Sequence, residues 1–188
     1  MPFNKLLPAV QAGKVDIAMS GITATAEREA LVTFAQPYMI SGQAILVRSE
    51  DIGSFAQPQI IYYMKTTIGV ERGSIAETIA QRMCQAATVV PYDSIASATK
   101  ALRSGSVRCV LGDAPVVWRK GAKYEARGLT TIPRLLTRER LAWAVRKGDT
   151  QMLNSANAAI RQWQGDGSLH AILSEFMPRY QVLSQMAR

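Results

Sequence analysis

The sequence predicts an α/β protein in which helices cover parallel β-sheets. Short stretches rich in Val and Ile alternate with amphipathic helical segments along most of the chain. No internal repeat and no low-complexity segment interrupts this alternation. With 188 residues, of which 48% are hydrophobic, the chain is long enough for one domain or two small ones with a substantial core.

Composition and charge argue against several classes of function. The 22 basic and 14 acidic residues give a net charge of +8, but Lys and Arg are scattered, so no nucleic-acid partner is expected. The single histidine, His170, and the absence of HExxH and DxDxDG patterns predict no metal site and no cofactor. No apolar run reaches the roughly 18 residues of a membrane span. Cys84 and Cys109 form no CxxC pair and are either free thiols or one disulfide.

The first part of the chain is expected to hold a helix, a strand and a second, short helix. Apolar residues recur at helical spacing before Gly13. Residues 15–20 then form a short buried strand. Thr23 or Thr25 caps the short helix, which carries Arg28.

The later elements alternate more regularly. A strand at 42–48 is followed by a loop at 49–59. Further strands are expected at residues 67–70, 87–92, 107–112, 129–133 and 140–145. Helices begin at capping residues, which are Ser74, Ser94, Asp113, Asp149 and Ser168. The last helix is amphipathic, with its inward side formed by Leu169, Ile172, Leu173 and Phe176.

Ligands of open parallel sheets bind beyond the carboxyl ends of the strands, which makes three turns candidate sites. The first turn offers hydroxyl and backbone groups and then a guanidinium, from Ser20, Gly21, Thr23 and Arg28. A helix N-terminus favours anions and an arginine fork matches a carboxylate, so this turn is a candidate carboxylate pocket. Alternatively, Thr25 only caps the helix and Arg28 pairs with a surface acid.

The other two turns follow the strands at 67–70 and 107–112. Gly73 permits a close backbone approach, and Ser74 opens a helix whose N-terminus can accept an anion, although a simple cap fits equally well. Asp113 is either such a cap or an acceptor for an ammonium group. A ligand that touches all three turns needs both a carboxylate and an amine, and an α-amino acid has both.

Five segments in order resemble the bacterial extracellular solute-binding proteins of family 3, the polar amino-acid receptors of ABC importers. They are LLPAVQAGKVDIAMSGITATAEREALVTFAQPYMISGQAILVR (6–48), IGVERGS (68–74), ALRSGSVRCVLGDAP (101–115), AWAVRKGD (142–149) and QWQGDGSLHAILSEFM (162–177). Together they extend the resemblance from about residue 3 to about residue 180.

The resemblance implies a two-lobed clamshell of the type II periplasmic-binding-protein fold. Lobe one would consist of residues 1–47 and 141–188, and lobe two of residues 50–139. Hinge strands would lie near 45–49 and 139–144.

The resemblance also implies roles for residues of the three turns. The family's arginine in the first turn binds the ligand carboxylate, and its aspartate after the later strand binds the amino group, which points to Arg28 and Asp113. The assisting groups would come from Ser20, Gly21, Thr23, Gly73 and Ser74. We add Glu71 to the ligand-binding set because its carboxylate hints at a cationic ligand side chain, whereas Arg72 hints at an anionic one. Which amino acid binds therefore stays open.

The chain departs from the family pattern in two respects. Arg108 and Cys109 stand where the family has Asp and Ala, at positions that do not contact ligand in the family. The family's first lobe starts with a β-α-β unit that has no counterpart before Phe3. We therefore expect lobe one to lack its first β-α-β unit and a signal peptide to be encoded upstream. The resemblance further implies a periplasmic monomer that docks onto the membrane permease subunits of an ABC importer.

Two other functions on the same scaffold remain open. One is an enzyme similar to the cyclohexadienyl dehydratases, for which Glu71 is the best candidate general acid. The other is the sensor domain of a receptor kinase or of a lytic transglycosylase. We expect a binding protein without catalytic residues.

Overall fold

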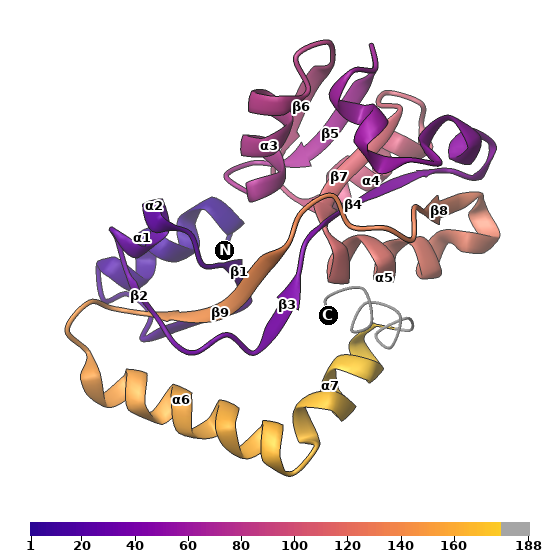
Figure 1. Cartoon of the computed structure of the whole chain (residues 1–188). Helices are drawn as coiled ribbons and strands as arrows, with labels where there is room; N and C mark the ends of the chain where they lie inside the picture. Colours follow the sequence, from indigo (N-terminus) through magenta and orange to yellow (C-terminus); the bar gives the residue numbers. More distant parts are fainter. Residues whose placement is uncertain (178–188) are drawn as a thin grey trace.

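The structure is a computed structural model that describes residues 1–177 of the chain. It contains two separate β-sheets, each with its own helices, joined by two crossing segments (Figure 1). The expected α/β class is therefore confirmed.

The first sheet is antiparallel in its described strands, in contrast to the parallel sheets that the sequence predicts. Its order is β1 (Ile17–Thr23), β9 (Glu139–Val145) and β2 (Thr33–Phe34), with β3 (Met39–Ser41) also paired to β9. β9 returns from a distant part of the chain and runs against all three partners. Periodicity identifies a strand but not its partner, so this direction lies beyond the reach of the pattern.

The helices at the start of the chain pack on the first sheet. η1 (Phe3–Lys5) and α1 (Leu6–Gln11) lie beside β1, and α2 (Ala26–Glu29) follows it. The buried side chains between them are Val10, Ala18, Ile22, Val32 and Ala144. An irregular register between Ala18 and Ile22 interrupts the pairing of β1, where Gly21 takes the left-handed conformation at φ 63°. The backbone of Ser20 and Gly21 is thereby released from regular pairing.

The second sheet mixes parallel and antiparallel pairs in the order β6-β5-β7-β4-β8. Its strands are β4 (Gln43–Arg48), β5 (Thr67–Glu71), β6 (Thr88–Tyr92), β7 (Cys109–Asp113) and β8 (Leu129–Thr131). β5 runs parallel to β6 and β7, as expected, whereas β4 runs antiparallel to β7 and β8. Glu71 and Asp113 both end parallel strands, so they lie at the same edge of this sheet.

Helices cover both faces of the second sheet. On one face, α4 (Ile95–Arg103) and α5 (Ala114–Tyr124) pack against Leu46 and Val110. On the other face, α3 (Ile75–Met83) packs with the 3-10 helices η2 (Ser49–Phe55) and η3 (Pro58–Tyr62). The short η4 (Glu125–Arg127) follows α5. The loop expected at 49–59 is thus largely helical, because Phe55 and Ile61 are fully buried and anchor it to the sheet.

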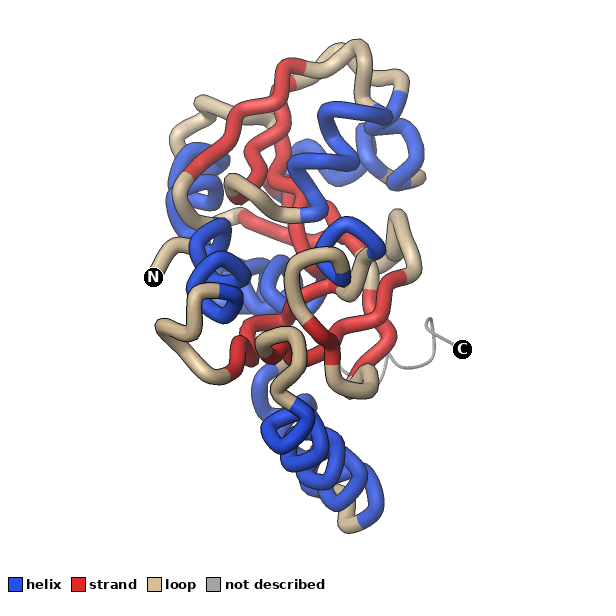
Figure 2. The backbone as a smooth tube through the Cα atoms, turned by 90° about the vertical axis from the view of Figure 1, so that its left-hand side faces the viewer, coloured by secondary structure: helices blue, strands red, loops and turns tan. Residues whose placement is uncertain are grey.

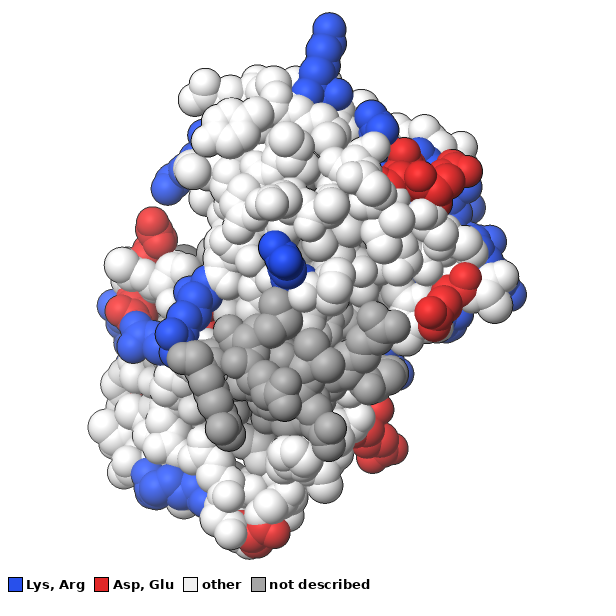
Figure 3. Space-filling model, turned by 45° about the vertical axis from the view of Figure 1, so that its right-hand side comes forward, with Lys and Arg blue, Asp and Glu red and all other residues white. Residues whose placement is uncertain are grey.

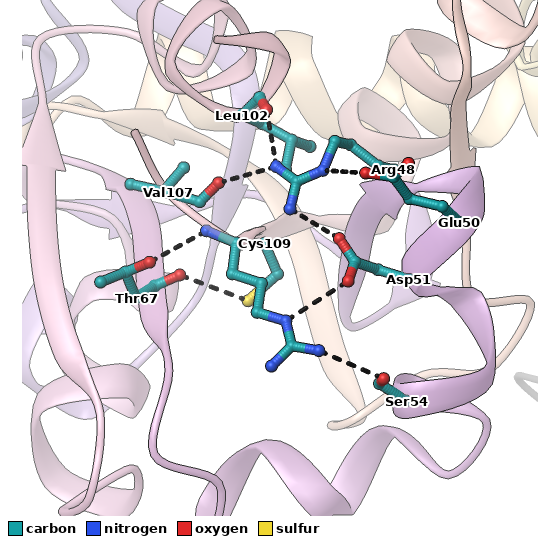
Figure 4. A network of polar contacts seen from close by, with 9 residues as sticks. Arg48, Glu50, Asp51, Ser54, Thr67, Leu102, Val107 and Cys109 are labelled. Atoms are coloured by element: carbon teal, nitrogen blue, oxygen red, sulfur yellow. Dashed lines mark hydrogen bonds and ion pairs between the residues drawn. The ribbon is translucent and has the colours of Figure 1, made fainter. Parts of the chain in front are cut away.

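A network of polar contacts ties η2 to the second sheet (Figure 4). Arg48 donates to Asp51 at 2.6 Å and to Glu50 at 3.1 Å. Arg108 donates to the other oxygen of Asp51 at 3.4 Å. Arg108, which stands where the family has Asp, therefore has a structural role here. Cys84 and Cys109 are both buried free thiols, which answers the question of the disulfide for this structure.

The two crossing segments touch each other through their backbones. A Cβ atom on Gly42 would lie 1.9 Å from the carbonyl oxygen of Thr137, so only glycine fits there. The backbone N–H of Gln43 donates to the Thr137 hydroxyl at 2.9 Å. Sheet membership changes at Gly42 and just before Glu139, while the proposed lobe boundaries and hinge strands stay predictions.

The last two helices, α6 (Thr150–Gly165) and α7 (Ser168–Phe176), extend from the first sheet (Figures 1 and 2). α6 packs on β9, where the rings of Trp143 and Trp163 meet edge to face at 5.5 Å. The expected inward side of α7 is only partly buried: Leu173 is buried, but Ile172 is 49% and Phe176 39% exposed. Among residues 1–177, no helix combines the length and apolar character needed to cross a membrane.

Candidate functional site

Arg28 bridges the first two candidate turns. Thr25 caps α2 by accepting the backbone N–H of Arg28 at 3.3 Å, as the local alternative predicted. Among residues 1–177, the guanidinium forms no ion pair with a surface acid. Its Nη1 donates to the Thr23 carbonyl at 3.0 Å and its Nη2 to the Gly73 carbonyl at 3.2 Å. The ring of Phe3 lies beneath it at 5.6 Å. Arg28 thus connects the first sheet's turn with the turn after β5.

Asp113 stands at the N-cap position of α5, as predicted, but its side chain makes no capping hydrogen bond. Its Oδ1 accepts the side-chain Nε2–H of Gln43 at 2.6 Å. Burial raises the pKa of Asp113 from 3.8 to about 6; the hydrogen bond from Gln43 lowers it, the charge of Glu139 raises it, and that of Arg28 lowers it. Because burial disfavours its ionised form, a cationic group of a ligand next to Asp113 would stabilise the charged carboxylate.

Glu139 lies in the same cluster, although sequence reasoning missed it. Its Oε2 accepts from the Thr23 hydroxyl at 2.7 Å and from Gln43 Nε2 at 3.1 Å, and its Oε1 accepts from Thr137. In the sequence it stands between Arg138 and Arg140, a setting that usually marks a solvated loop. The only available signal is its place directly before an apolar strand.

The polar groups of the turn after β5 are used mainly in capping α3. The Ser74 hydroxyl accepts the Glu77 backbone N–H at 3.2 Å, and Glu77 in return accepts from the Gly73 N–H at 2.6 Å. Ser74 is therefore a helix cap, which is the first of the two roles that the sequence allows for it. Gly73 has φ 74°, and a Cβ there would come 2.6 Å from the Cβ of Asn4. The turn is therefore packed closely against the 3-10 helix η1 beside the first sheet.

Glu71 lies at the end of β5 and is partly buried. Burial raises the pKa of Glu71, partly offset by a backbone hydrogen bond at Ile95. Its charge in turn contributes to the raised pKa of Asp113. Glu71 therefore belongs to the electrostatic surroundings of the site.

A cavity of about 560 Å³ opens next to this cluster. Of the residues predicted from the sequence, Ser20, Gly21 and Asp113 line it, whereas Arg28, Thr23, Glu71, Gly73 and Ser74 do not. The rest of its lining is mainly apolar and includes Tyr38, Trp143, Trp163, Leu169, Ile172 and Phe176. Burial raises the pKa of Tyr38 to about 12, so its phenol is neutral.

The arrangement has the chemistry of a binding site for a zwitterion. A guanidinium fork and a carboxylate lie in one cluster at the junction of the two sheets, and hydroxyl and backbone groups surround them. On the face drawn in Figure 3, Lys and Arg side chains are dispersed among uncharged surface. Among residues 1–177, no three His, Cys, Asp or Glu side chains gather as a metal site would need.

Comparisons with known proteins find related sequences and related structures. The family model described as bacterial extracellular solute-binding proteins, family 3, matches residues 1–179. The chain is 27% identical to ABC transporter arginine-binding protein 1 of Escherichia coli (strain K12), over 94% of this chain and 72% of that protein.

Two solved structures are similar over comparable lengths. An ancestral arginine-binding protein bound to arginine is 28% identical with a TM-score of 0.82, over 94% of this chain and 77% of that one. The ancestral amino acid-binding protein AncCDT-1, a precursor of cyclohexadienyl dehydratase, is 31% identical with a TM-score of 0.80, over 93% and 73%.

Proposed function

Because the chain belongs to the bacterial extracellular solute-binding proteins of family 3, we propose that it binds a polar L-amino acid between its two sheets. It then presents this amino acid to the permease subunits of an ABC importer. The fold is that of the type II periplasmic binding proteins, as the resemblance predicted.

One observation carries the proposal: Arg28, on α2 beside the first sheet, and Asp113, at the end of a strand of the second sheet, meet in one cluster of opposite charges. The α-carboxylate of an amino acid would replace the carbonyl oxygens of Thr23 and Gly73 as the partner of Arg28. The α-ammonium would take the free side of Asp113. Since each sheet supplies one partner, the ligand stabilises the arrangement in which the sheets approach each other.

Isothermal titration calorimetry with a panel of L-amino acids tests this function. Arg28→Ala should remove measurable affinity, because the ligand carboxylate loses its cation. Arg161→Ala is a matched control, since Arg161 is an exposed arginine on α6. Affinity of Arg28→Ala equal to that of the control would refute the assignment.

A second candidate is an enzyme of the cyclohexadienyl dehydratase type. The raised pKa of Glu71 is the observation in its favour, since a general acid must keep its proton. AncCDT-1, although a precursor of such an enzyme, is itself described as an amino acid-binding protein. An assay for prephenate turnover separates the two functions, and we expect none.

Location and assembly follow from the family rather than from the site. We place the protein in the periplasm as a monomer, with the permease subunits as its partners. Fractionation of cells and light scattering of the purified protein test these two points. A dimer at micromolar concentration would contradict the second.

A further inference from the structure

Glu139 occupies the place where the chain passes between the two sheets. It is the first residue of β9, and Gln43 is the first residue of β4. The two crossing segments are in backbone contact at Gly42 and Thr137, so both side chains start from fixed positions. Their orientation is therefore set by the fold before any ligand arrives.

The contacts of Glu139 form a continuous chain across the junction. The Thr23 hydroxyl of the first sheet donates to Glu139 at 2.7 Å. Gln43 Nε2 donates to both Glu139 and Asp113, at 3.1 and 2.6 Å. One fully buried amide thus holds two carboxylates, one at the crossing and one at the end of β7. Asp113 keeps its second oxygen without a partner in the described residues, available to a ligand.

The charges in the cluster do not balance. Asp113 is faced by the carboxylates of Glu139 from β9 and Glu71 from β5, by the guanidinium of Arg28 from α2, and by the neutral phenol of Tyr38. Arg28 is also shared with the carboxylate of Glu27, so the acidic groups of the cluster outnumber its one cation. An amino acid with a neutral side chain adds no net charge, whereas one with a cationic side chain adds the positive charge that the cluster lacks.

We propose that Glu139 is a positioning and specificity-determining residue of the ligand site. Through the shared amide of Gln43 it holds Asp113 in place, and its charge favours amino acids with a cationic side chain over neutral ones. The second part rests on the proposed amino-acid-binding function, whereas the first part concerns the ligand-free protein.

Glu139→Gln tests the selectivity, because it removes the charge and keeps the size of the side chain. Calorimetry with arginine and with glutamine compares ligands of similar length that differ in side-chain charge. The arginine affinity should fall about tenfold, and the glutamine affinity by less than about threefold. Glu139→Asp keeps the charge and should keep the preference for arginine, and Glu125→Gln is an exposed control. An equal loss for both ligands, or no loss for either, overturns the proposal.

A ligand-free measurement separates this inference from the proposed function. Carboxyl ¹³C NMR follows the titration of Asp113 in the wild type and in Glu139→Gln. Without the charge of Glu139, the midpoint should move to lower pH, because one neighbouring negative charge is gone. A midpoint that moves to higher pH would instead show that the hydrogen bond from Gln43 to Asp113 is lost without Glu139, and an unchanged midpoint overturns the proposed coupling of the two carboxylates. Failure of the wild type to bind any amino acid would refute the proposed function and leave this titration as the test of Glu139.

Discussion

Replacing Asp113 with Asn should make the protein more stable while it removes the acceptor for the ligand ammonium. Burial raises the pKa of Asp113 from 3.8 to about 6, which means that the folded state disfavours the charged carboxylate. Asn cannot ionise, and its side-chain oxygen can still accept the hydrogen bond from Gln43. The variant therefore keeps the geometry and loses the buried charge.

The size of the effect follows from the two pKa values. Between 3.8 in the unfolded chain and about 6 in the folded one, the linkage amounts to about 3 kcal/mol, as an upper value because the carboxyl borders the cavity. A carboxyl with a raised pKa favours folding below pH 3.8 and loses that contribution as the pH rises through about 6. The advantage of Asp113→Asn should thus be close to zero near pH 3.5 and largest above about pH 7.

Urea denaturation between pH 4 and pH 8 measures this difference directly. Asp93→Asn is the matched control, because the Asp93 side chain is 89% exposed. The reasoning is refuted if Asp113→Asn is no more stable than the wild type at pH 8, or if its advantage does not change with pH. Calorimetry on the same variant should show strongly weakened amino-acid binding, so stability and function would change in opposite directions.

Three further changes have defined outcomes. Amino-acid affinity should be constant above about pH 6 and fall about tenfold per pH unit below it, because protonated Asp113 no longer attracts the ammonium; calorimetry in buffers from pH 4.5 to pH 8 checks this. Gly42→Ala should lower the free energy of unfolding by more than about 2 kcal/mol, since its Cβ would overlap the Thr137 carbonyl; a urea titration that shows wild-type stability would contradict the contact. Asp51→Ala should cost about 1–3 kcal/mol, because it leaves the two arginines of Figure 4 without their shared acceptor; a thermal melt equal to that of the wild type would contradict the network.

Sequence reasoning succeeds here where the physics is local. The caps at Thr25 and Ser74 depend on residues three positions away; the pattern identifies Ser74 and narrows the first cap to Thr23 or Thr25, of which the structure shows Thr25. The positions of Glu71 and Asp113 at strand ends follow from periodicity and from the direction of the strands. Local rules therefore predict most helices and strands. They also predict the positions of Ser74 and Asp113 in the second and third candidate turns.

Where sequence reasoning fails, the cause is distance along the chain. Glu139 finds its partner Thr23 at a separation of 116 positions, and no local pattern encodes that contact. The antiparallel direction of β9 has the same origin, since its partners lie at the other end of the chain. The exposure of Ile172 and Phe176 also depends on what faces α7, which helical periodicity does not contain.

The close contact between Gly42 and Thr137 has a consequence for the lobe movement that the proposed function requires. Because one backbone rests directly on the other, and the Thr137 hydroxyl accepts the Gln43 N–H, neither crossing segment can slide along its neighbour without breaking the contact. Rotation about this point needs no such break. If the two sheets rotate relative to each other when a ligand binds, as the proposed function requires, this contact lies at the axis of the rotation. The charged groups of Asp113 and Glu139 lie close to it, where a given rotation displaces them least. Residues farther out on either sheet would travel through longer arcs, so under the proposed function they are the ones whose position would report the closed state to the permease.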